Sequence, residues 1–380
     1  MSKWGNQMIY LDYAANTPVS QEVLEVFQEV SMTYIANPNS SHRLGREAKA
    51  RLDLSTAETA KILGVKENEI IYTSGASEAN NLAVKGIAET YKRHGRHMIT
   101  TYLEHSSVTG ALTALQSKGY EVDFVDILDN GLVDLEHLKE LLREDTILVS
   151  IGYVDSELGI EQPVDQIGEI LSHYPHCFFH VDATQAIGKI PVSLEFIDLI
   201  VFSPHKFYGL NGSGVLIKKE NLLLEPLIHG GKSTTIFRSG TPMLALAAAA
   251  EKALALAVSS QKGNDEKVRM LNKKLQEALK RYPKVTINST EKSVPYILNV
   301  SVVGVKSIVF QEELEKHSVY ISTKSACCPV NTVSKAVYAL TKDKKRALST
   351  LRISLSHLTT EEELDVFLQC FEQCYKKLVK

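Results

Sequence analysis

Two side chains in this sequence stand where a buried β-strand is predicted to end, and that position would alter the chemistry of each. Lys206 follows the apolar run IDLIVF, in the stretch SPHKFYG, and Asp182 ends the apolar run CFFHVD. A lysine in apolar surroundings can have a depressed pKa and form a Schiff base. A buried carboxylate costs desolvation energy unless a donor pairs with it. Taken singly, Lys206 is also explained as a surface lysine in a turn, and Asp182 as a cap of the following turn.

A third segment, TSGASEANN at residues 73–81, has the features of an anion site. It places a glycine-containing turn after a predicted strand and immediately before a predicted helix, where free N–H groups and the helix dipole favour an anion. The hydroxyls of Ser74 and Ser77 add donors, although a plain capped turn is the simpler interpretation of this segment alone. Together, an anion turn, an acid at a strand end and a lysine at a later strand end are, in chain order, what pyridoxal phosphate requires.

Helical and strand patterns alternate from about residue 20 to 255, which predicts a mostly parallel sheet covered by helices. Ligands of such sheets lie beyond the carboxyl ends of the strands. Buried strands are predicted at HMITTYLEHSS, YEVDFVD and TILVSIGYVD, and further strands at EIIYTSG, which ends in a turn, and at CFFHVDA, LIVFSPH and GVLIKK. A capping serine is expected to start the helix SEANNLAVKGIAETYKRHG.

A long helical stretch from Thr241 to about Leu279 is expected to lead into a second part of the chain. That part has predicted strands at KVTIN, YILNVSV and SVYIST. We predict a large cofactor-binding domain over residues 20–258, and a small α+β domain formed by residues 1–19 and 259–380.

The 380 residues are 44% hydrophobic and 23% charged, as in an ordinary soluble globular protein. The net charge of −3 gives no general attraction to nucleic acid or to an anionic membrane. No stretch approaches the ~18 apolar residues of a membrane span, and the first residues do not form a signal peptide. We therefore expect a cytoplasmic protein that contacts neither a membrane nor nucleic acid directly.

The five cysteines do not describe a disulfide framework, because their number is odd and no export signal is evident. No CxxC pair or His/Cys cluster predicts a metal site. Cys177, Cys370 and Cys374 are interpreted as small buried hydrophobes. Cys327 and Cys328 differ, since they lie among small and turn-forming residues in STKSACCPVN.

The sequence resembles the cysteine desulfurases, which are pyridoxal-phosphate enzymes with the aspartate-aminotransferase fold. The resemblance covers nearly the whole chain and is carried by LDYAAN, NPNSSHRLG, TSGASEANNLA, LEHSSV, HVDATQAIGK, SPHKFYG, RSGTP, STKSAC and LRISL. It implies an α/β protein of pyridoxal-phosphate fold type I, with a mostly parallel sheet, helices on both of its faces and a smaller α+β domain.

The resemblance also implies which residues surround the cofactor ring. It gives Lys206 the covalent link to pyridoxal phosphate and the later proton transfers at the substrate α-carbon. Asp182 pairs with the pyridine nitrogen, and His105 stacks on the ring face. Gln185 bonds near the phenolate oxygen, where Ser156 replaces the asparagine that is usual in the family and retains one hydrogen bond of shorter reach.

By the same resemblance, Ala76, Ser77, Ser203 and His205 hold the phosphate group. Thr241 of RSGTP corresponds to a threonine that reaches the phosphate of the partner subunit's cofactor. This correspondence implies a homodimer with its sites at the interface.

For the substrate, L-cysteine, the resemblance assigns Arg352 to a bidentate pair with the carboxylate, helped by Asn37. Cys327 is the implied nucleophile: its thiolate attacks the substrate Sγ, alanine leaves, and a persulfide remains on the protein. The long interval between Cys327 and Arg352 is typical of desulfurases that pass sulfur directly to an acceptor, either a tRNA-thiolation enzyme or an iron–sulfur scaffold.

Two departures lie beside the implied nucleophile: Lys324 replaces the glycine that is usual before SAC, and a second cysteine, Cys328, directly follows Cys327. They suggest a specialised member with its own acceptor, with Lys324 lowering the Cys327 pKa or contacting an acidic partner.

Other functions compete with this hypothesis. A selenocysteine or cystine lyase would use the same cofactor but would need no acceptor thiol at Cys327. A hydrolase pairing Cys327 with His105 or His357 would have no use for Lys206 beside Asp182. A non-catalytic scaffold would have no need of any of these residues.

Overall fold

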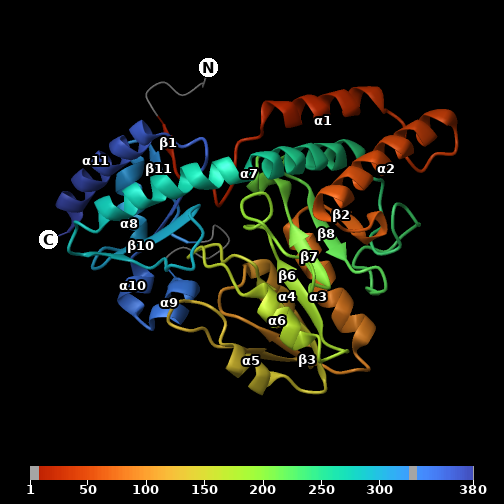
Figure 1. The fold of residues 1–380 in the computed structure, drawn as a ribbon, viewed down its shortest axis with the longest axis horizontal. Helices are drawn as coiled ribbons and strands as arrows, with labels where there is room; N and C mark the ends of the chain where they lie inside the picture. The colour runs from red at the N-terminus through yellow and green to blue at the C-terminus, as the bar shows by residue number, and fades with distance from the viewer. Residues whose placement is uncertain (1–7, 325–331, 380) are drawn as a thin grey trace.

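The computed structural model describes residues 8–324 and 332–379, and its central feature is a seven-stranded sheet (Figure 1). The strand order is β2-β8-β7-β6-β5-β3-β4, and β8 alone runs antiparallel to its two neighbours. The strands are β2 (Ile70–Thr73), β3 (His97–Thr100), β4 (Glu121–Phe124), β5 (Thr146–Gly152), β6 (Phe178–Asp182), β7 (Leu199–Phe202) and β8 (Gly214–Lys218). The predicted mostly parallel sheet is confirmed.

Helices cover both faces of this sheet, as the sequence predicts. One face packs on α3 and α4 and the other on α6 and α7, so the central strands are buried on both sides. This double burial explains their continuous apolar sequences. The elements of this part are α1 (Gln21–Thr33), α2 (Arg43–Leu63), η1 (Glu67–Glu69), α3 (Ala76–Tyr91), α4 (Ser106–Gln116), α5 (Leu135–Leu141), α6 (Val164–Leu171), η2 (Pro204–Lys206) and α7 (Leu244–Leu279).

The outermost strand, β4, corrects one prediction. The segment YEVDFVD was expected to be buried, but Glu121 is exposed and the rest of β4 is half-buried. The reason is its position: β4 pairs only with β3, at the edge of the sheet. An edge strand has one side free for polar residues such as Glu121 and Asp123.

The remaining elements form two small sheets with helices beside them. An antiparallel sheet has the order β12-β10-β9, and β1 pairs in parallel with β11. These elements are β1 (Ile9–Tyr10), β9 (Val285–Ile287), β10 (Ile297–Val302), α8 (Ser307–Glu315), β11 (Val319–Tyr320), α9 (Lys335–Thr341), α10 (Lys344–Leu348), β12 (Thr350–Ser354) and α11 (Glu361–Leu378).

Helix α7 connects the two parts (Figure 1). Its 36 residues span about 54 Å. Its first turns pack against α1 and α2 through Leu244 and Ala248, and Lys274 near its other end pairs with Glu361 and Asp365 of α11. The predicted domain boundary at residue 258 falls inside this unbroken helix, and the division of the chain stays a prediction.

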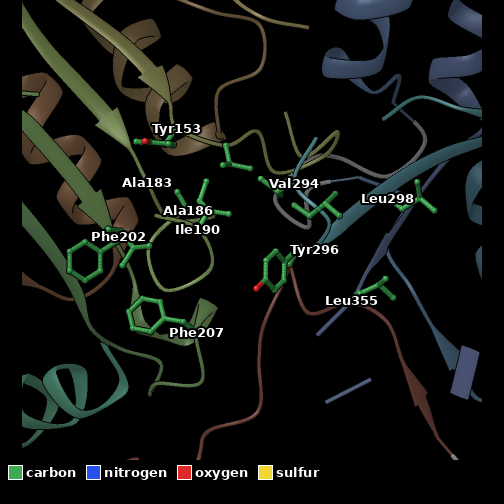
Figure 2. Packing of buried hydrophobic residues seen from close by; sticks show 14 of the residues in the cluster. Tyr153, Ala183, Ala186, Ile190, Phe202, Phe207, Val294, Tyr296, Leu298 and Leu355 are labelled. Carbon is green, nitrogen blue, oxygen red and sulfur yellow. The ribbon is translucent and has the colours of Figure 1, made fainter. Parts of the chain in front are cut away.

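A continuous hydrophobic cluster extends from the large sheet to the small one (Figure 2). It includes Phe202 and Phe207 on one side, and Tyr296 and Leu298 on the other. The shared core fixes the large sheet against the small one, which matters because the site described below draws residues from both. None of the helices in the described ranges combines the length and apolarity needed to cross a lipid bilayer.

The three cysteines expected to be structural are buried free thiols: Cys177, Cys370 and Cys374. Burial raises the pKa of Cys374 to about 11, so its thiol stays protonated at neutral pH. Cys327 and Cys328 lie outside the described residues.

Candidate active site

A cavity of about 390 Å³ opens at the carboxyl ends of β5 and β6, where the strand-end rule places a ligand. Most of the residues expected to hold a cofactor or substrate line it. These are Ala76, Ser77, His105, Ser156, Asp182, Gln185, His205, Lys206 and Arg352.

Three other predicted residues do not line this cavity. Ser203 is fully buried behind His205. Asn37 is exposed in the connection between α1 and α2, and Thr241 borders a separate small hollow together with Arg238. The roles expected for Asn37 and Thr241 stay predictions.

The anion turn lies at the start of α3, which begins at Ala76. Its N-cap is Gly75, which offers no side-chain cap, so the predicted capping serine was wrong. The uncapped first turn leaves N–H groups for an anion in the cavity, beside the Ser77 hydroxyl. Gly214 of β8 passes so close that an added Cβ would lie 2.3 Å from the Gly75 carbonyl carbon. The turn therefore needs glycine at position 214.

His205 lines the same cavity as a neutral imidazole. Burial lowers its pKa to about 4, and the charges of Lys206 and Lys189 act in the same direction. Ser203 Oγ donates to the Ser213 carbonyl at 2.7 Å, so it accepts the 2.8 Å bond from His205 Nδ1. The Nε2 atom of neutral His205 is therefore an acceptor, and it becomes a donor only when the ring is protonated.

Asp182, the last residue of β6, also lines the cavity and is 8% exposed. One carboxylate oxygen accepts from Asn80 Nδ2 at 2.7 Å and the other from the Thr184 N–H at 3.0 Å. Asn80 is fully buried, donates also to Ser107 Oγ at 2.8 Å, and accepts from His180 Nε2 at 3.1 Å. Asp182 is thus held by hydrogen-bond donors, as a buried carboxylate requires.

The same network sets the tautomer of His105. The Ser107 N–H donates to His105 Nδ1 at 3.2 Å, so this nitrogen is an acceptor and Ser107 Oγ, which accepts from Asn80, donates to it at 2.8 Å. The ring proton of neutral His105 is therefore on Nε2. Burial lowers the pKa of His105, and the Lys206 charge adds to this effect while Asp182 opposes it.

Lys206, the last residue of η2, is held by the segment that follows β1. Its Nζ donates to the carbonyl oxygens of Ala14 at 2.9 Å and Ala15 at 2.6 Å. Gln185 Nε2 donates to the same Ala14 carbonyl at 2.8 Å. Thr17 Oγ1 donates to the carbonyl of His205 at 2.9 Å. Sequence reasoning noted LDYAAN as a motif but assigned its residues no role.

Arg352 of β12 is 2% exposed and reaches the cavity from the smaller part. Its guanidinium donates to Asp12 Oδ1 at 2.9 Å and to the Ser156 carbonyl oxygen at 2.9 Å. Within the described residues, Arg352 Nε is buried without a hydrogen-bond partner. Ser156 therefore acts here through its backbone, and its expected side-chain contact stays a prediction.

Two further acids with raised pKa values, Glu104 and Asp155, line the cavity, and sequence reasoning missed both. Burial raises the pKa of Glu104 to about 8 and that of Asp155 to about 7. One oxygen of Glu104 accepts from the Gly152 N–H and from Thr101 Oγ1, both at 2.9 Å. The second oxygen of each acid is buried without a partner in the described part of the chain. A carboxyl group in such surroundings is more stable protonated than ionised.

Lys324 contacts Thr332, the first described residue after the segment that holds Cys327. Its side chain is buried, and its Nζ donates to the Thr332 carbonyl at 3.0 Å. It links the two described ends flanking residues 325–331. The roles expected for Lys324, lowering the Cys327 pKa or contacting an acidic partner, stay predictions.

The sheet topology and the site together define the class: an α/β protein of the aspartate-aminotransferase fold, with its ligand cavity at the strand ends. Residues 9–367 match the model of the family described as aminotransferase class-V. The chain therefore belongs to the class-V aminotransferase family.

Individual relatives align along nearly the whole chain. A protein of Lactobacillus delbrueckii subsp. bulgaricus, named NifS/IcsS protein homolog, is 37% identical over 379 residues, which cover 98% of each chain. The cysteine desulfurase IscS of Dictyoglomus turgidum is 34% identical over 375 residues, covering 97% of this chain and 95% of that protein. A solved structure named NifS-like protein has a TM-score of 0.92 at 34% identity, and covers 98% of this chain and 100% of its own.

Proposed function

We propose that the protein is a pyridoxal-phosphate-dependent cysteine desulfurase that converts L-cysteine to L-alanine and retains the sulfur as a persulfide on Cys327. The observation that carries this proposal is the meeting of Lys206, Asp182 and the start of α3 in one cavity. The relatives named cysteine desulfurase support the choice of substrate.

The residues of the cavity fit the cofactor. The uncapped start of α3 suits its phosphate, and the donor-held Asp182 suits a protonated pyridine nitrogen. Lys206 lines the same cavity, where its Nζ would form the covalent link to the carbonyl carbon of the cofactor. When bound, the cofactor draws electrons from the substrate α-carbon and its neighbours.

The protein's own groups bind and orient the substrate and move its protons. Arg352, held by Asp12 and by the Ser156 carbonyl, is already oriented for the substrate carboxylate, which reduces the entropy lost on binding. Lys206 moves the proton at the α-carbon, and the carbonyl oxygens of Ala14 and Ala15 hold its ammonium form. His105 supplies a neutral ring with its proton on Nε2.

Cys327 completes the reaction. Its thiolate attacks the substrate Sγ, the bond between Sγ and Cβ breaks, and the electron pair stays on the carbon, which takes up a proton. The products are alanine and a Cys327 persulfide. We further propose a cytoplasmic homodimer, in which Thr241 contacts the partner's phosphate site, and an acceptor protein for the sulfur in tRNA thiolation or iron–sulfur assembly.

The test is to supply L-cysteine to the purified protein and to measure alanine and protein-bound sulfane sulfur. Formation of both supports the proposal, whereas pyruvate and ammonia would indicate a lyase. We expect Lys206→Ala to abolish the yellow colour, and Cys327→Ala to stay yellow without forming persulfide. Cys328→Ala is the matched control. Full turnover of Cys327→Ala together with loss in Cys328→Ala would show that the nucleophile is misassigned.

A further inference from the structure

Lys189 is a buried cation next to the site that the mechanism above does not use. It lies in the turn region after β6, is 8% exposed, and does not line the cavity. Its pKa is lowered to about 7, mainly by burial and in part by the charges of Lys206 and Arg352. Because burying an ammonium costs desolvation energy, its position needs a compensating role.

The contact that Lys189 makes is with Gln185. Lys189 Nζ lies 2.6 Å from Gln185 Oε1, while Gln185 Nε2 donates to the Ala14 carbonyl at 2.8 Å. A peptide carbonyl can only accept, so Gln185 Nε2 faces Ala14, and Gln185 Oε1 then accepts from Lys189 Nζ. The second hydrogen on Nε2 remains for the cavity, which Gln185 lines.

We propose that Lys189 is a positioning residue that acts through Gln185: it anchors and polarises the carboxamide so that Nε2–H donates to the phenolate oxygen of bound pyridoxal phosphate. The inference rests on the proposed function and adds a determinant of its proton chemistry. A donor to the phenolate oxygen withdraws negative charge from it. With less negative charge nearby, a proton on the nitrogen that joins Lys206 to the cofactor is stabilised less, and the pKa of that nitrogen falls.

The test is a spectral pH titration of the yellow protein, which measures the pKa of this nitrogen directly. We expect Lys189→Met to raise it by about one unit, the size expected for loss of one hydrogen bond. Gln185→Leu is expected to raise it as well. In the Gln185→Leu background, Lys189→Met is expected to raise this pKa much less than it does in the wild-type protein.

A matched control is available in Lys218, which is 2% exposed and donates to the carbonyl oxygens of Lys219 and Glu220. Lys218→Met removes a buried lysine that does not line the cavity, so the chromophore pKa should not change. Lys189→Gln serves if Lys189→Met fails to fold. Lys189→Gln keeps a donor for Gln185 Oε1 but lacks the charge, so we expect it to raise the chromophore pKa less than Lys189→Met does.

The outcomes separate this inference from the function on which it rests. A yellow Lys189 variant with an unchanged chromophore pKa refutes the inference. Equal shifts from Lys189→Met with and without Gln185 refute action through Gln185, and would assign the effect to charge alone. A wild-type protein that never becomes yellow with pyridoxal phosphate would instead overturn the proposed function.

Discussion

Replacing Glu104 with glutamine is expected to change how the stability of the protein depends on pH. Burial raises the pKa of the Glu104 carboxyl group from its ordinary value of 4.5 to about 8. Between these values the folded protein keeps the proton and the unfolded chain releases it, so the free energy of unfolding falls as pH rises. For one group the slope reaches at most about 1.4 kcal/mol per pH unit. Glutamine removes this slope and retains an oxygen for the Gly152 and Thr101 donors.

The measurement is the urea midpoint of wild type and Glu104→Gln at pH values from 5 to 8. The two proteins should have similar stabilities near pH 5, and the variant should become progressively more stable than wild type as pH rises. The matched control is Glu144→Gln, at an exposed position, which should leave the profile unchanged. Parallel profiles of wild type and Glu104→Gln would refute the conclusion that the folded protein holds this proton.

Two further substitutions test the network and the anion turn. Asn80→Leu removes the donor to Asp182 and leaves buried polar groups unpaired, at a cost of roughly 3 kcal/mol. The melting temperature of Asn80→Leu should fall by about 5 °C or more. The matched control is Asn81→Ala, at the neighbouring half-buried position of α3, which should change the melting temperature little. Equal melting temperatures of wild type and Asn80→Leu would contradict the role of Asn80. Gly214→Ala pushes a methyl group against Gly75, and the affinity for pyridoxal phosphate should fall about tenfold or more. Equilibrium dialysis measures this affinity, and an unchanged value would show that the turn does not hold the phosphate.

The central strands of the sheet could be predicted from sequence because strands buried on both faces have continuous apolar runs. The exposure of β4 could not, because a strand's place at the edge depends on which strands pair with it and not on its own residues. The cap of α3 was misassigned for a related reason. Serine is a common cap, but here the helix begins at Ala76 and Gly75 takes the cap position, next to Gly214 of β8.

Within the site, the strand-end rule located Asp182 and Lys206, whose signal is local: a polar side chain directly after an apolar run. Asn80 and Lys189 carry no such signal. Asn80 is a polar residue in a polar stretch, and its buried place becomes evident only when α3 packs on the strand carrying Asp182, 102 residues later. Their hydrogen-bond partners are set by tertiary packing, which spacing along the chain does not encode.

The segment after β1 has a consequence for the order of folding. Asp12 meets Arg352 across 340 residues, and β1 pairs with β11, which is made more than 300 residues later. During synthesis, the carbonyl oxygens that hold Lys206 therefore cannot be fixed in place until nearly all of the chain has left the ribosome. The large sheet can form earlier, since its last strand, β8, ends at Lys218. A nascent chain should thus have a folded sheet well before it can hold Lys206 in its working position, and a chain that stops early cannot begin catalysis.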